Sequence, residues 1–236
     1  MGISGPGHHK TVQNTPHFGP DLFAFFRDLK THNERDWFAV NRERYERSVE
    51  GPMLQFIADV GQRLPEISPA FRADARRFGG SLYRLQRDTR FSPDKSPYKL
   101  WTAAIFRHRS ARKGHQAPGF YLHLDPGHNF GGGGLYHPEQ QALTRVRQHM
   151  IDHAADWNAV RKTGIEIQGQ RLTRVPAGFD RTHPLAEDLK WKDLYAGVAF
   201  TDDEVTAADF LDRYIECCVQ AGPLVQFLTK ALDLTY

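Results

Sequence analysis

The order of hydrophobic patterns along this chain constrains its fold more than any other feature. Apolar residues recur at helical spacing over 22–29, 37–49 and 53–64. Short segments bounded by Gly, Pro, Asp or Asn then follow at 81–89, 103–107, 119–125 and 129–136, which is typical of antiparallel strands. Helical spacing returns over 138–150, around 157, and over 202–218 and 224–232, with a short helical piece within 180–192 and one more short strand at 198–200. This order predicts an α+β fold with N-terminal helices, a central mostly antiparallel sheet and C-terminal helices.

Individual residues predict where several of these elements begin and end. Asn33 is expected to cap the second helix, and the Gly-Pro pair at 51–52 is expected to end it. Pro138 is expected to begin the helix that follows the sheet. A second Gly-Pro pair, at 222–223, predicts a break between the last two helices.

Length and composition fit one globular unit. The chain has 236 residues, of which 40% are hydrophobic and 25% charged. We expect residues 21–236 to form a single α+β domain and the Gly/His/Pro-rich residues 1–20 to form a flexible tail. No segment resembles a secretory leader or approaches the roughly 18 apolar residues of a membrane span. Cys217 and Cys218 are adjacent and are expected to lie buried in a helix, so the sequence predicts a cytoplasmic protein without membrane partners.

Positive charge is concentrated in one window. Residues 71–113 contain twelve Lys and Arg against three Asp, a net charge of +9. The rest of the chain has 19 basic and 25 acidic residues, a net charge of −6, although the whole chain is only at +3. A local excess of this kind attracts an anionic partner to one part of the surface.

The most unusual text lies inside this window, at residues 84–99, and reads R-L-Q-R-D-T-R-F-S-P-D-K-S-P-Y-K. Its pattern R-x-x-R-D-x-R-F-x-x-D-K-x-x-Y resembles the signature of the domain of unknown function 2461 family. Similar family stretches occur at 33–45, at 121–134 and at 174–184, so the resemblance covers nearly the whole chain after the tail. The resemblance implies no particular activity, and the function must be inferred from the residues.

A strand over 81–90 would place Arg84, Gln86, Asp88 and Arg90 on one face. Guanidinium groups at this spacing form a permanently charged clamp, which suits a phosphate, carboxylate or sulfate. After a turn at 92–94, the following basic and tyrosine side chains are expected to fold back over the same surface. The sequence thus predicts a site for a small anionic ligand, most readily a phosphorylated one, lined by Arg84, Arg87, Asp88, Arg90, Lys95, Tyr98 and Lys99.

Candidates for proton transfer follow on the best predicted strand. His123 and Asp125 are two residues apart and share a face, so they form a candidate acid–base pair, with Tyr98 as a candidate proton donor. Whether the chain is an enzyme, and with which cofactor, stays open at this stage. His149 and His153 are spaced for one helix face but lack a third ligand, and a group of His123, Asp125, His128 and His137 is a weaker alternative, so no metal is predicted.

Two other functions fit the same residues. Basic residues interleaved with Tyr83, Phe91 and Trp101 would suit a nucleic-acid-binding module. Alternatively, the Arg/Asp motif is a structural ion-pair network of a non-catalytic interaction protein. The four glycines at 131–134 are interpreted as a bulged strand or tight turn, with an anion-binding nest as the alternative. The sequence leaves the oligomeric state open.

Overall fold

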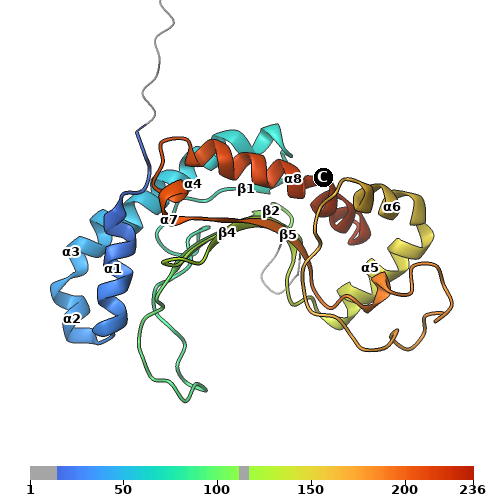
Figure 1. The fold of residues 1–236 in the computed structure, drawn as a ribbon, viewed down its shortest axis with the longest axis horizontal. Helices are drawn as coiled ribbons and strands as arrows, with labels where there is room; N and C mark the ends of the chain where they lie inside the picture. The colour runs from blue at the N-terminus through green and yellow to red at the C-terminus, as the bar shows by residue number, and fades with distance from the viewer. Residues whose placement is uncertain (1–14, 112–116) are drawn as a thin grey trace, which may run out of the picture.

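The computed structural model describes residues 15–111 and 117–236 (Figure 1). Five antiparallel strands form one sheet in the order β1-β2-β3-β4-β5, so each strand pairs with the next one along the chain. Their bounds are β1 Phe71–Arg72, β2 Thr102–His108, β3 Gly119–Leu124, β4 Asn129–Leu135 and β5 Leu194–Phe200. The four longer strands overlap predicted strands, although only residues 198–200 of β5 were predicted, and buried residues alternate regularly along β3.

Helices precede and follow the sheet, as predicted, and the α+β class is confirmed. Before it lie α1 Pro20–Thr31, α2 Arg35–Val40, α3 Arg42–Tyr45, the π-helical turn η1 Glu46–Glu50, α4 Gly51–Arg63 and the 3₁₀ turn η2 Leu64–Glu66. Between β4 and β5 lie α5 Gln140–Asp152, α6 Ala154–Lys162 and the 3₁₀ turn η3 Asp188–Lys190. After β5 come α7 Asp202–Val205 and α8 Phe210–Ala231.

One face of the sheet is covered and the other is open. Helix α8 lies along β4 and β5 on the covered face, with α4 beside it, whereas Figure 1 shows no helix lying across the opposite face. We call this opposite surface the open face. The N-terminal helices stand at one side of it and α5 and α6 at the other (Figure 1). Side chains of alternate strand residues, among them Tyr121 and His123 of β3, therefore point to a surface that the helices leave accessible.

The glycine run is a regular part of β4, which excludes a bulge, a tight turn and an anion nest. A Cβ at Gly131 would lie 2.9 Å from the Tyr214 ring, and one at Gly133 would lie 2.7 Å from Val225, so these two glycines let α8 approach the sheet. The remaining two face β5. A Cβ at Gly132 would lie 2.1 Å from the carbonyl oxygen of Ala196. The run is thus explained by close packing on both sides of β4.

Two predicted helix breaks are wrong. At Gly51 the chain stays helical, because the wide π turn η1 joins α3 to α4 without interruption. A Cβ at Gly51 would lie 2.9 Å from the carbonyl oxygen of Glu46, so the glycine accommodates this turn. Helix α8 likewise continues through Pro223, whose neighbours Leu224 and Val225 are fully buried. Burial there outweighs the backbone hydrogen bond that a proline removes.

Two further predictions need correction. Residues 81–89 make isolated bridges, Leu82 with Ala104 and Gln86 with Tyr98, and no regular strand. Asn33 does not cap α2, whose first residue is preceded by Glu34. Its amide instead pairs with the backbone of Tyr98, donating to the carbonyl oxygen at 3.0 Å and accepting from the N–H at 3.1 Å. The Asn33 amide, which can both donate and accept, thus joins the start of α2 to the segment around Tyr98.

Helix α8 joins two hydrophobic clusters. Its first half packs with α1, α4 and the covered face of the sheet, and its second half packs with α5 and α6. Residues 1–14 of the predicted tail lie outside the described residues, but Phe18, also within that tail, is completely buried. Ordered structure therefore begins before residue 21. Cys217 and Cys218 are both buried in α8, as predicted, and burial raises the pKa of Cys217 to about 11.

Candidate functional site

The signature residues 84–99 form an irregular hairpin, which we call the arm. Its two sides are joined by backbone hydrogen bonds from Arg87 to Pro97 and from Lys99 to Leu85, each of 2.9 Å. The arm extends from the sheet on the side opposite α8 (Figure 1). Tyr98 anchors it, because this side chain is buried against Phe38 with ring centroids 4.4 Å apart. The predicted proton donor thus lies in the hydrophobic core.

Much of the arm's charge is satisfied within the arm. Arg90 forms two side-chain hydrogen bonds with Asp88, of 2.9 and 2.7 Å. Arg87 pairs with Asp94 and also donates to the Ser96 carbonyl oxygen. Hydrogen bonds from Ser96, followed by the Arg87 contact, lower the pKa of Asp94 to about 2. These pairs join residues of the arm to one another.

Lys95 also bonds within the arm, to the Thr89 carbonyl oxygen at 2.9 Å. Arg84 and Lys99 lie at the base of the arm and, like Lys95, differ from the paired Arg87 and Arg90. Among residues 15–111 and 117–236, neither Arg84 nor Lys99 has an ion-pair partner. The Lys99 ammonium donates to the Arg84 carbonyl oxygen and lies 4.9 Å from the Trp101 ring centroid and 5.6 Å from that of Tyr83. Burial, and then the nearby Arg84 charge, lower the pKa of Lys99.

Aromatic side chains continue from this base across the open face. Trp101 contacts His123 with centroids 4.7 Å apart, and His123 stacks on Phe130 at 4.9 Å and 20°. Tyr83 meets Tyr121 edge-on at 6.0 Å. Phe130 keeps 41% of its surface exposed, which is unusual for a ring in a sheet. We call this group the aromatic patch: Tyr83, Trp101, Tyr121, His123 and Phe130.

The floor beside the aromatic patch carries no side chains. Tyr121 pairs across the sheet with Gly132, which pairs in turn with Gly197 on β5. Gly132 itself is buried and Gly197 is partly exposed. The aromatic patch is a surface suited to a planar group.

The predicted acid–base residues His123 and Asp125 form hydrogen bonds with different partners. The Nδ1 atom of His123 is hydrogen-bonded to the Tyr121 hydroxyl at 3.0 Å. In the described part of the chain, no hydrogen bond joins His123 to Asp125, whose backbone groups instead close the β3–β4 turn with Asn129 and His128. Burial lowers the pKa of His123 to about 4, so the ring is neutral at pH 7. Burial also raises the pKa of Asp125.

Acidification is expected to weaken the fold through His123. Because its folded pKa of about 4 lies below the ordinary 6.5, the unfolded chain binds the proton first as the pH falls. The stability that this group contributes is therefore complete above pH 6.5 and lost towards pH 4. We expect a loss of about 1–2 kcal/mol, allowing for solvent screening of the partly exposed ring. Urea unfolding of the wild type and His123→Gln at pH 7 and pH 4.5 measures it, and an unchanged pH dependence in the variant would contradict the assignment.

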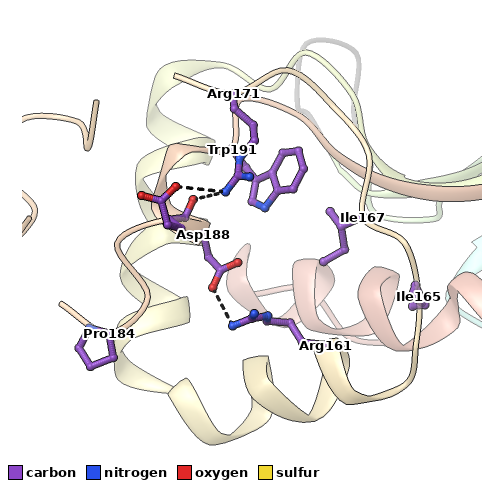
Figure 2. A pocket seen from close by; sticks show the side chains of 8 residues that line it. Arg161, Ile165, Ile167, Arg171, Pro184, Asp188 and Trp191 are labelled. Carbon is purple, nitrogen blue, oxygen red and sulfur yellow. Dashed lines mark hydrogen bonds and ion pairs between the residues drawn. The ribbon is translucent and has the colours of Figure 1, made fainter. Parts of the chain in front are cut away.

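Two cavities lie away from the arm, around the segment between α6 and β5. The larger has a volume of about 510 Å³ (Figure 2). Its lining consists of Arg161, Ile165, Ile167, Arg171, Pro184, Glu187, Asp188 and Trp191. Its arginines are already matched: Arg161 pairs with Asp188 at 3.2 Å, and Arg171 lies 4.4 Å above the Trp191 ring. Neither cavity is lined by a residue that the sequence predicted for ligand binding.

The histidine groups considered for metal binding are not arranged as metal sites. The rings of His149 and His153 are 4.2 Å apart, and His149 also contacts Phe227. In the part of the chain that the structure describes, no group of three or more His, Cys, Asp or Glu side chains is placed to hold a metal ion.

Sequence reasoning missed the aromatic patch as a unit. Trp101, Tyr121 and Phe130 come from three segments, and the strand register brings them together. The available signal was the alternation in residues 119–125, which already places Tyr121 and His123 on one face. Phe130 could not be added without knowing that it pairs with His123.

Comparison with known proteins assigns the chain to a family without a described function. Neither the curated proteins nor the solved structures include a match to it. Within the described residues, no helix has both the length and the apolar character needed to cross a membrane. Residues 21–227 match the family described as conserved hypothetical protein, DUF2461. This match covers the arm, the aromatic patch and most of α8, and the chain therefore belongs to the DUF2461 family.

Proposed function

We propose that this protein binds a small anionic ligand with a planar ring, most readily a phosphorylated one such as a nucleotide, on the open face at the base of the arm. The observation that carries the proposal is the position of Lys99 and Arg84. In the described chain neither forms a salt bridge, which is also true of Lys95, and Lys99 lies against Trp101 and Tyr83 of the aromatic patch.

The charge of these two residues favours an anion. Lys99 is half-buried against Trp101 and Tyr83 and is repelled by Arg84, since both effects lower its pKa. Its ammonium group has three donors, one of which is used by the Arg84 carbonyl oxygen. An anionic group would accept from the others and would offset the repulsion between the two cations.

The neighbouring surface favours a planar ring. The partly exposed Phe130 supports stacking, which is worth about 1–3 kcal/mol per base in proteins that bind nucleic acids. His123 adds a neutral ring at pH 7 and no charge, so we assign it a stacking role. Lys99 and Arg84 lie together at the base of the arm, and this favours a compact ligand.

A binding experiment with matched lysine variants tests the proposal. Calorimetric titration with nucleoside mono- and diphosphates and with inorganic phosphate would compare the wild type with Lys99→Met, Trp101→Leu and Lys95→Met. We expect the first two changes to weaken binding of a nucleotide about 10-fold or more, because one removes a charged contact and the other a stacking ring. Lys95→Met removes the same charge from the far end of the arm and should change affinity less than about 3-fold.

Two results would overturn this assignment. One is the absence of saturable nucleotide binding to the folded wild type. The other is equal weakening by Lys95→Met and Lys99→Met, which would indicate a diffuse field rather than a site.

A specific observation favours a second candidate, single-stranded nucleic acid lying along the arm. Phe91 is 94% exposed, and the Arg90 guanidinium lies 5.8 Å from its ring centroid. Exposed rings next to cations are used to stack bases of single strands. Binding of an oligonucleotide that falls steeply with salt and is lost in Phe91→Ala would select this candidate.

A further inference from the structure

The smaller of the two cavities, of about 220 Å³, lies beyond the C-terminal end of β4 and is independent of the open-face site. His137 follows Phe130 by seven residues, or roughly 23 Å along an extended chain. The volume equals that of about seven waters at roughly 30 Å³ each, so it suits a small molecule. Its lining consists of His137, Pro138, Gln140, Leu143, Arg147, Leu172, Lys192 and Asp193.

Arg147 of α5 is the unusual member of this lining. Only 1% of its surface is exposed, yet no carboxylate of the described residues pairs with it. Its Nε donates to the Leu189 carbonyl oxygen at 2.7 Å and its Nη2 to that of Trp191 at 2.9 Å. The third nitrogen, Nη1, is shielded from solvent and has no hydrogen-bond partner. A buried guanidinium with an unused donor is costly and calls for an acceptor.

The carboxylate in the same cavity does not supply that acceptor, because its oxygens are occupied elsewhere. Asp193, also 1% exposed, accepts from the backbone N–H of His137 at 2.7 Å and pairs with its Nδ1 at 3.0 Å. Its second oxygen accepts from the Gln170 N–H at 3.2 Å. These contacts fix His137 at the cavity with a backbone φ of 48°. Lys192 adds a second permanent positive charge to the lining.

We propose that this cavity binds a small oxyanion, namely the phosphate or carboxylate group of a small molecule, with Arg147 as its buried counter-charge and Lys192 at its edge. Arg147 and Lys192 line the cavity with one carboxylate whose charge is already offset by three N–H groups, so the lining favours a negative ligand. The larger cavity lacks this imbalance, because each of its arginines lies beside a carboxylate.

Calorimetric titration with inorganic phosphate and, separately, with acetate tests this site and separates the two sources of the oxyanion. The wild type would be compared with Arg147→Lys, Lys192→Met and Lys162→Met, after circular dichroism has verified that each is folded. We expect saturable binding of one anion, weakened about 10-fold by Lys192→Met and by Arg147→Lys. Lys162→Met removes the same charge from the exposed end of α6 and should leave affinity unchanged.

The result that overturns the proposal is the absence of saturable binding of both anions to the folded wild type. Full affinity in Lys192→Met, or an equal loss in Lys162→Met, would also overturn it. Arg147 holds the 189–191 turn, so if circular dichroism shows its variant to be unfolded, the Lys192 comparison decides the outcome alone. Lys99→Met should leave this binding intact, so failure here is distinct from failure at the open face.

Discussion

Gly132→Ala is expected to destabilise the protein by about 3 kcal/mol or more. A Cβ at this position would lie 2.1 Å from the carbonyl oxygen of Ala196 and 2.7 Å from the Cα of Gly197. Both are backbone atoms of β5, and they can move away only if the β4–β5 ladder separates at this register. Urea unfolding followed by circular dichroism would measure the loss as a lower midpoint with an unchanged slope.

Two other glycines provide graded comparisons. Gly19, just before α1, has nothing within 4 Å of its Cβ position, so Gly19→Ala should change stability by less than about 1 kcal/mol. Gly133→Ala should be intermediate, because its Cβ would meet side chains of Val225 and Phe120 that can shift. A loss at Gly132 as small as that at Gly19 would contradict the close approach of β4 and β5.

Phe18→Ala is expected to cost about 3–5 kcal/mol of folding stability. This ring lies before α1 and is 0% exposed, with centroids 5.2 Å from Phe56 of α4 and 6.0 Å from Phe210 of α8. Its removal leaves a cavity between helices from both ends of the chain, which a rigid core fills only in part. The free energy of unfolding in urea measures the loss, and a chain shortened to begin at residue 21 should lose at least as much.

Phe91→Ala is the matched control, because it removes the same side chain from a position that is 94% exposed. We expect this change to alter stability by less than about 0.5 kcal/mol. Equal effects of the two substitutions would mean that Phe18 does not belong to the core.

The two large effects differ in how far they could be foreseen. Phe18 is apolar but lies in the run Pro16-His17-Phe18-Gly19-Pro20, so no periodic pattern marks it as buried. The glycine run is conspicuous in the sequence, yet the same letters fit a turn, a nest or a strand. Its cause, close contact with both α8 and β5, depends on partners that lie from 60 to 92 residues away, such as Leu194 for Gly134 and Val225 for Gly133.

The candidate sites, too, could be predicted from the sequence only in part. The sequence located the basic window, and the arm that it forms does carry paired and unpaired cations. It could not tell which cations lack carboxylates, because Arg90 and Arg84 belong to the same motif and differ only in their neighbours. The cavity around Arg147 was not predicted at all. Helical spacing predicts which face of α5 is buried. Whether Arg147 on that face finds a partner depends on the loop that packs against it, which accepts from Nε but leaves Nη1 without a hydrogen bond.

The amino-acid sequence by itself determined the α+β order, the position of most helices and strands, and the family. These follow from local periodicity, which records the side of each element that is buried. The tertiary structure alone decided the continuity of α8 through Pro223, the pairing of His123 with Tyr121, and the assembly of the aromatic patch. Each depends on contacts between segments distant in sequence, where burial and register outweigh the local preference of any one residue.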